Sequence, residues 1–246
     1  MATFPDYKNR IVAFVDILGF KSLVSSLGAE PDLHSKLYDA LSQIRNYKKL
    51  SRDKSVLFSD IEVSTFSDSI VISAKEENIF HIIRTCGWLQ ANLLKSGILI
   101  RGGISSGLTI HENGILYGEG MINAYHLESK CAIYPRILLD PALLKTLNPN
   151  ITKFCLTQDL DGLWFVDFFK FYAFTNIGDD AIADGYDPRE IYFSEMKECI
   201  ETTLQTEERI NVISKWKWLQ NKLQDAMGFD PSRAFLSHLG NDSELI

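Results

Sequence analysis

Two aspartates and an arginine interrupt strongly apolar stretches of this chain. The stretches span residues 12–20, 64–73 and 98–107, and the interrupting residues are Asp16, Asp68 and Arg101. A buried carboxylate is costly unless it is paired, hydrogen-bonded or bound to a metal. Two converging carboxylates suit a hard divalent cation, and a guanidinium suits a polyphosphate. Together the three residues predict metal-assisted chemistry on a phosphorylated substrate. Each residue taken alone has another interpretation. Asp16 could cap a helix or pair with a lysine. Arg101 could lie at the surface or form a salt bridge at a strand edge.

The elements that would position these residues follow from hydrophobic periodicity. Strands are expected at residues 10–16, 56–65, 69–74, 98–106 and 136–139. Helices are expected from Lys21 and at residues 31–48, 76–96, 121–129 and 188–227. Ser67 and Asp68 are expected in the turn of a β-hairpin. Later short strands are expected at 153–157 and 163–171, on either side of a turn at 159–162.

This order of elements predicts an α+β sandwich in which helices cover one face of a mixed or antiparallel sheet. The helix at 76–96 is expected to turn its larger apolar residues inward, namely Ile79, Ile82, Ile83, Trp88, Leu89 and Leu93. We expect three parts, a core at 1–150, strands and a loop that complete it at 151–187, and a helical C-terminal extension at 188–246. Trp216 and Trp218 are expected to pack in a core or a dimer interface.

Composition excludes several classes of protein. The 246 residues carry a formal net charge of −7, which argues against a general DNA or RNA binder. Nothing approaches the ~20 apolar residues of a membrane span. No secretory leader is expected before residue 10, because Pro5, Asp6 and Lys8 interrupt any apolar run. The four cysteines show no CxxC pairing, so neither a zinc site nor a disulfide framework is expected. A cytoplasmic protein is therefore expected.

Four motifs occur in the order seen in class III nucleotidyl cyclases, and the chain resembles their catalytic domain. They are FVDILGF at 14–20, the hairpin around Asp68, RGGISSG at 101–107 and YGEGMINAYHLES at 117–129. The short layout, with KWKWL at 215–219 in a helical tail, resembles the pyrimidine cyclases of bacterial Pycsar antiphage systems. The resemblance implies a ferredoxin-like class III cyclase sandwich.

The resemblance also implies roles for individual residues. Two divalent ions, Mn²⁺ or Mg²⁺, would be held by the carboxylates of Asp16 and Asp68 and by the Ile17 carbonyl. The backbone amides of Leu18, Gly19 and Phe20 would bind the β- and γ-phosphates, with Phe14 in the same nucleotide-binding segment. Arg101 would hold the terminal phosphate.

Two departures from the family's pattern concern the base. The position of the lysine that reads a purine falls on Ser64, and its acidic partner position falls on Ile115. Ser64 and Glu62 are the expected base contacts. This favours a pyrimidine, with UTP converted to cyclic UMP, and leaves CTP, ATP and GTP open.

A further departure concerns the transition state. The family's asparagine and arginine positions hold Ile122 and His126. Asn123 is adjacent to the first, and Asn123 and His126 are candidate nucleotide contacts, with Lys130 and Lys21 as alternative cations. A degenerate domain that binds a nucleotide without catalysis therefore also stays open.

The resemblance finally implies partners. A homodimer would share its active sites between subunits, with the metal site from one and the base pocket from the other. A separately encoded effector would respond to the cyclic nucleotide.

Overall fold

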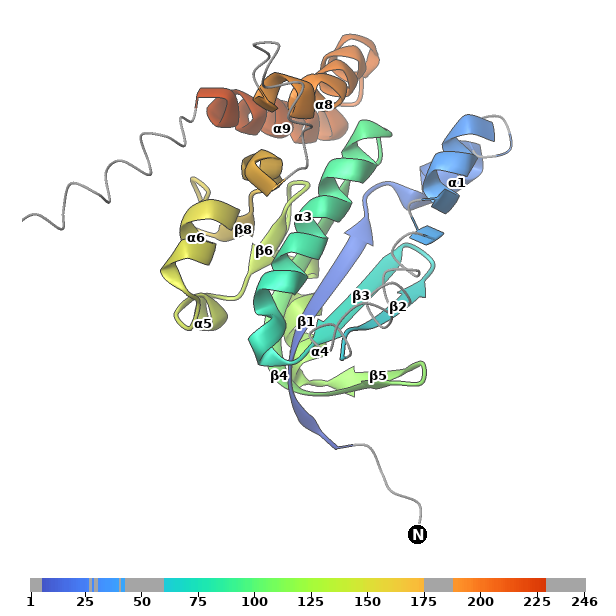
Figure 1. Ribbon diagram of the computed structural model, residues 1–246. Helices are drawn as coiled ribbons and strands as arrows, with labels where there is room; N and C mark the ends of the chain where they lie inside the picture. Colours follow the sequence, from blue (N-terminus) through green and yellow to red (C-terminus); the bar gives the residue numbers. More distant parts are fainter. Residues whose placement is uncertain are drawn as a thin grey trace, which may run out of the picture. The chain divides into compact units, whose positions relative to one another are not determined.

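Figure 1 shows a computed structural model of the chain, which describes residues 6–26, 28, 31–39, 41–42, 60–174 and 188–228. The chain divides into two compact units, Met1–Thr175 and Asn176–Ile246. Several predicted features lie outside the described residues. These are the end of the helix at 31–48, the start of the strand at 56–65 and the loop at 176–187.

The first unit is built on one mixed sheet. Its strands are β1 Lys8–Ile17, β2 Glu62–Phe66, β3 Ser69–Ala74, β4 Ile100–Glu112, β5 Ile115–Gly118, β6 Ile137–Leu139, β7 Leu156–Gln158 and β8 Trp164–Val166. Their order is β2-β3-β1-β4-β6-β8-β7, and β5 pairs with β4. Only the β4–β6 pairing is parallel among the described strands. Strands β2 and β3 form the predicted hairpin, with Ser67 and Asp68 in its turn.

Helices account for most of the remaining described residues. They are α1 Phe20–Ser26, a 3-10 turn Glu76–Asn78, α3 Ile79–Lys95, α4 Glu119–His126, a π-helical segment Leu127–Cys131, α5 Pro141–Leu144, α6 Pro149–Cys155, a 3-10 helix Phe168–Phe174, α8 Pro188–Thr206 and α9 Ile210–Gly228. Residues 31–39 and 41–42 are also helical. The α+β class and the helical C-terminal part are confirmed.

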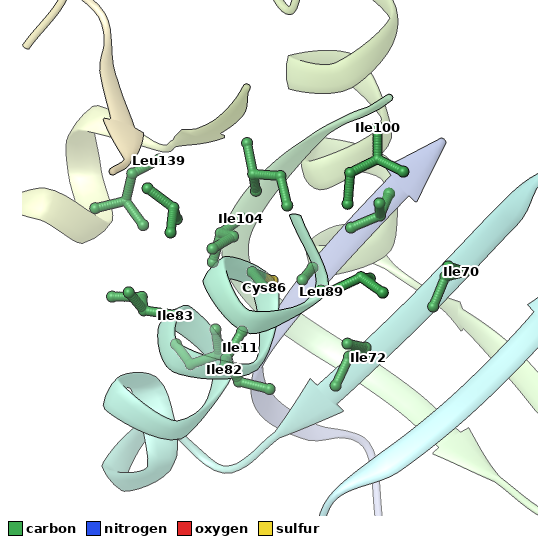
Figure 2. Packing of buried hydrophobic residues seen from close by; sticks show 14 of the residues in the cluster. Ile11, Ile70, Ile72, Ile82, Ile83, Cys86, Leu89, Ile100, Ile104 and Leu139 are labelled. Atoms are coloured by element: carbon green, nitrogen blue, oxygen red, sulfur yellow. The ribbon is translucent and has the colours of Figure 1, made fainter. Parts of the chain in front are cut away.

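One face of the sheet is predominantly apolar and packs against α3. Alternate residues of β1 point to it because side chains alternate along a strand. Figure 2 shows Ile11 of β1 and Ile72 of β3 beside Ile82 and Cys86 of α3. This layer forms the main core of the unit.

The opposite face of the sheet carries the polar residues and is covered in part by α4. Val12 and Phe14 of β1 form a small cluster there with Val71 and with Ala124 of α4. Helices therefore lie on both faces, and the expectation that they cover one face was wrong. The hydrophobic period alone does not assign a helix to a face.

Close contact between α4 and β4 depends on glycine. A β-carbon at Gly103 would lie 2.5 Å from the Ala124 carbonyl oxygen and from the Leu127 β-carbon. Gly118, which ends β5, has φ +140°, and a β-carbon there would lie 2.2 Å from the Leu108 carbonyl oxygen. Both positions require glycine because the neighbouring atoms are largely backbone.

Three local predictions were wrong. The strand predicted at 153–157 begins only at Leu156, as β7. Residues 149–155 form α6, because Pro149 occupies the first turn and the Asn148 side chain accepts the Asn150 N–H. The strand at 163–171 ends at Val166, after which a 3-10 helix begins and Lys170 N–H donates to the Asp167 carbonyl. Trp88 is 39% exposed, since the buried stripe of α3 runs through other positions.

The second unit contains α8 and α9, which pack against each other. The helical segment predicted at 188–227 forms two helices, separated at residues 207–209. The Glu207 carboxylate accepts the backbone N–H groups of Glu208 and Arg209, which precede α9. Trp216 and Trp218 of α9 are buried. No helix within the described residues is long and apolar enough to cross a membrane.

Candidate functional site

Strand register brings Asp16, Asp68 and Arg101 to one end of the polar face. Asp16, near the end of β1, pairs with Ser69 of β3 on one side and with Arg101 of β4 on the other. The Ile17 N–H donates to the Asp68 carbonyl at 3.0 Å, so the hairpin turn is fixed against the end of β1. The order β3-β1-β4 therefore gathers three residues that are up to 85 positions apart.

The Asp16 carboxylate is partly buried, with 20% of its side chain exposed. Burial raises its pKa above the ordinary 3.8, Arg101 opposes this, and the nearby Asp68 carboxylate raises the pKa further. Arg101 Nε donates to Asp16 Oδ2 at 3.5 Å, a long contact. Burial and the Asp68 carboxylate thus both disfavour the charge of Asp16, and a divalent cation bound between the two acids would stabilise it.

Glu128 is a third carboxylate of this site, and the sequence reading did not single it out. Its Oε1 lies 2.7 Å from Arg101 Nε, and its side chain is only 4% exposed. The two groups form an ion pair without hydrogen-bond geometry, and no described group donates a hydrogen bond to Glu128 Oε1. Glu128 lies four residues after the buried Ala124, so helical spacing was a signal that it faces inward.

The π-helical segment positions this glutamate. Leu127–Cys131 follows α4 directly and widens the helix by one residue per turn. Arg101 Nη1 donates to the Ala132 carbonyl at 3.3 Å, immediately after the segment. Burial raises the pKa of Glu128 above the ordinary 4.5, Arg101 opposes this, and Asp16 and Asp68 add to it. The three carboxylates are thus electrostatically coupled around Arg101.

The predicted phosphate-binding loop follows β1. Gly19 has φ +72°, a conformation that favours glycine. The Leu18 N–H donates to the Leu99 carbonyl at 2.8 Å, so in this structure it is not directed to a phosphate, contrary to expectation. Helix α1 spans only seven residues, with its Leu23 N–H bonded to the Gly19 carbonyl. The amides of Gly19 and Phe20 remain the predicted phosphate ligands of the loop.

The predicted base contacts, Glu62 and Ser64, lie on the polar face of β2, because they pair with Ser73 and Val71 of β3. Ser64 Oγ lies 2.8 Å from His111 Nε2. His111 comes from the far end of β4, beyond its pairing with β1, where β4 and β5 run across the ends of β3 and β2 (Figure 1). Sequence reasoning missed His111.

The other predicted contacts lie on or under α4. Phe14 is buried in the cluster below α4 and meets Tyr125 edge-on, with ring centroids 5.4 Å apart. Asn123 and His126 are exposed on α4, as is Ile122. In the described residues, none of these three α4 side chains forms a hydrogen bond or an ion pair with Asp16 or Arg101. Their roles stay predictions.

The described residues contain no group of three or more histidine, cysteine, aspartate or glutamate side chains arranged to hold a metal ion. Asp16 and Asp68 supply the oxygen ligands that a magnesium or manganese ion prefers, and such ions often use only one or two protein carboxylates with substrate phosphates. The donor set therefore fits a metal that binds together with a nucleotide.

A scan of the sequence against family models and a search of curated proteins each found no match. Solved structures with a similar chain trace were found. The guanylyl cyclase domain of the RhoGC fusion protein from the aquatic fungus Blastocladiella emersonii is 19% identical, with 65% of this chain and 95% of that chain covered and a TM-score of 0.44. The adenylyl cyclase CyaB from P. aeruginosa is 14% identical, with 65% and 93% covered and a TM-score of 0.41. A bacterial light-regulated adenylyl cyclase is 13% identical, with 81% and 100% covered and a TM-score of 0.42.

Proposed function

We propose that this protein is a nucleotide cyclase that converts UTP to 3′,5′-cyclic UMP and pyrophosphate. The observation that carries the proposal is the convergence of Asp16, Asp68 and Arg101 at one end of the sheet. The order of the sequence motifs, which resembles class III cyclases, supports the choice of reaction. The further resemblance to Pycsar pyrimidine cyclases supports a role as a signal in bacterial antiphage defence.

In the proposed reaction the ribose 3′-oxygen attacks the α-phosphorus, the bond to the β-phosphate oxygen breaks, and the hydroxyl proton is released. Asp16 and Asp68 would hold the divalent ions, with the Ile17 carbonyl as a further ligand. Two such ions, when bound, activate the attacking oxygen and neutralise charge on the leaving pyrophosphate.

Arg101 would bind the terminal phosphate. Two nitrogens of its guanidinium have partners in the protein. Nη1 donates to the Ala132 carbonyl, and Nε lies beside the carboxylates of Asp16 and Glu128. A triphosphate would compete with these carboxylates for the same cation. Glu128 therefore keeps Arg101 oriented toward the site and neutralised when no nucleotide is present.

The preference for UTP is supported by Ser64 at the position where the family reads a purine with lysine. A neutral hydroxyl beside Glu62 suits the polar edge of a small base. Cytidine, adenosine and guanosine triphosphates are the competing substrates, and cyclic CMP is the nearest alternative product.

The active enzyme is proposed to be a homodimer with shared sites. Ser64 and Glu62 of one subunit would face the base bound at the Asp16 and Asp68 of the other. A separately encoded effector would bind the cyclic nucleotide.

A second candidate is a nucleotide-binding domain without catalysis. It is favoured by Ile122 and His126, which stand where the family stabilises its transition state with asparagine and arginine. The raised pKa values of Asp16 and Glu128 favour the enzyme, because a purely structural site gains nothing from two acids whose charge is disfavoured.

The purified protein would be incubated with Mn²⁺ and an equimolar mixture of ATP, GTP, CTP and UTP, and products separated by mass. We expect cyclic UMP as the main product, with none from Asp68→Asn. Cyclic AMP or GMP as the main product would contradict the base assignment and retain the metal site. Binding of UTP without any product would favour the second candidate.

A further inference from the structure

His111 is enclosed by two serine hydroxyls from other strands. Its ring is buried, with 4% of the residue exposed. Nδ1 lies 2.9 Å from Ser73 Oγ, and Nε2 lies 2.8 Å from Ser64 Oγ. Arg10 Nε donates to the same Ser73 Oγ at 3.0 Å. The four side chains form a continuous hydrogen-bonded chain that ends at Ser64 on the predicted base-reading face.

Which group donates and which accepts along these hydrogen bonds is determined from the buried end, at Arg10 and Ser73. Arginine is always protonated and can only donate, so Ser73 Oγ accepts from Arg10. A hydroxyl can accept two hydrogen bonds and donate one, and in the fully buried Ser73 we assign the donated proton to His111 Nδ1, 2.9 Å away. A neutral imidazole that accepts at Nδ1 carries its proton on Nε2, and this N–H donates to Ser64 Oγ.

The same reasoning gives the orientation of the Ser64 hydroxyl group. Its oxygen accepts from His111, so its own hydroxyl proton is left to point to the more exposed side of β2. Ser64 is only partly buried, whereas Ser73 and His111 are buried. An isolated serine can donate or accept equally well and discriminates poorly between an acceptor and a donor. A serine with a fixed polarity does discriminate.

We propose that Arg10, Ser73 and His111 form a polarity relay that holds Ser64 as a hydrogen-bond donor toward the nucleobase. The relay selects a base with a carbonyl acceptor over one with an amino group, and so selects UTP over CTP. His111 is a positioning residue that acts through Ser64. The identity of the ligand rests on the proposed function, whereas the direction of the relay rests on these contacts and on a neutral His111 imidazole.

The direction is tested by the nitrogen chemical shifts of ¹⁵N-labelled histidine in the full-length protein. The His111 signals are identified by their loss in His111→Asn. We expect Nε2 protonated and Nδ1 unprotonated in the wild type. Protonation at Nδ1, or at both nitrogens, would overturn the relay. Ser73→Ala should allow both tautomers, because Nδ1 loses its donor. Ser105→Ala, which removes another buried serine of the same face, should leave the His111 signals unchanged.

The selectivity is tested by the ratio of kcat/KM for UTP to that for CTP. Ser64→Ala and Ser73→Ala should each lower this ratio, roughly three- to tenfold, the range expected for one hydrogen bond of about 0.5–1.5 kcal/mol. Ser105→Ala should retain the wild-type ratio. A wild-type ratio near one, or a Ser73→Ala ratio equal to that of the wild type, would overturn the inference.

Failure of the proposed function would look different. If the wild type cyclises no nucleotide, the cyclase assignment fails. The relay is then tested by the His111 tautomer and by the ratio of the dissociation constants of UTP and CTP, measured in Mn²⁺. The same variants and the same expected factors apply. If the wild type cyclises UTP and the tautomer is the opposite one, only the relay fails.

Discussion

Arg101 and Glu128 form an ion pair at 2.7 Å between the end of a central strand and a π-helical segment that follows α4. The glutamate is almost completely buried, whereas the arginine is 29% exposed on the side of Asp16. The pair thus joins the sheet to the helix that covers its polar face. It also places an arginine beside the two aspartates proposed to hold metal.

The first prediction concerns this pair. Arg101→Ala should lower the free energy of unfolding by about 1–3 kcal/mol, because the Glu128 carboxylate loses its partner in a buried position. The double variant Arg101→Ala/Glu128→Gln should be more stable than the sum of the two single changes predicts. Urea unfolding of the four proteins measures the coupling. Additive effects would show that the ion pair contributes nothing to the fold.

The second prediction concerns pH. Because burial raises the pKa of Glu128 above 4.5, the folded protein holds this proton more tightly than the unfolded chain. The contribution of Glu128 to stability is therefore complete below about pH 4.5 and is lost as the pH rises through the folded pKa. Glu128→Gln should remove this part of the pH dependence. Urea unfolding in EDTA at several pH values measures the free energy of unfolding of the wild type and of Glu128→Gln. If this free energy changes with pH in the same way in both proteins, the prediction is wrong.

The third prediction concerns the packing of α4. Gly103→Ala should destabilise the protein by about 2 kcal/mol, because the new methyl group meets the Ala124 carbonyl and forces α4 away from β4. Gly228→Ala is the matched control, because no atom lies within 4 Å of a β-carbon there. Equal stability of the two variants would contradict the packing argument.

The fourth prediction concerns shared sites in a homodimer. Asp68→Asn removes a proposed metal ligand, and Ser64→Trp is designed to fill the base-reading face. Each variant alone should be inactive. An equal mixture should regain roughly a quarter of the wild-type activity, because half of the dimers are mixed and each has one intact site. A mixture as inactive as its components, with mixed dimers shown to form, would place both residues in the site of one subunit.

Much of the first unit could be predicted from the sequence because its periodicity is local. The continuous apolar run from Ile11 to Val15 predicts a buried strand, and the structure has one that is buried on both faces. Asp16 breaks that pattern at the strand end, and this single irregularity located the candidate site. The hairpin at Ser67 and Asp68 was equally visible, because turn residues separate two β-branched runs.

The missed features depend on contacts that no local pattern contains. His111 meets Ser64 and Ser73, 47 and 38 residues away, only because of the strand order and the course of the β4–β5 hairpin. The importance of Glu128 depends on how α4 continues into a π-helical segment. The start of α6 was missed for a local reason, since Asn148 and Pro149 form a capping signal that the β-branched residues after it obscured.

The most direct test of the cyclase proposal is the stoichiometry of products from UTP. The protein would be incubated with Mn²⁺ and UTP labelled at the α-phosphorus, and cyclic UMP and pyrophosphate measured together. We predict equal amounts of the two, abolished by EDTA and by Asp16→Asn. Release of orthophosphate with UDP, or release of pyrophosphate with linear UMP, would show that the site transfers phosphate to water and would contradict a cyclase.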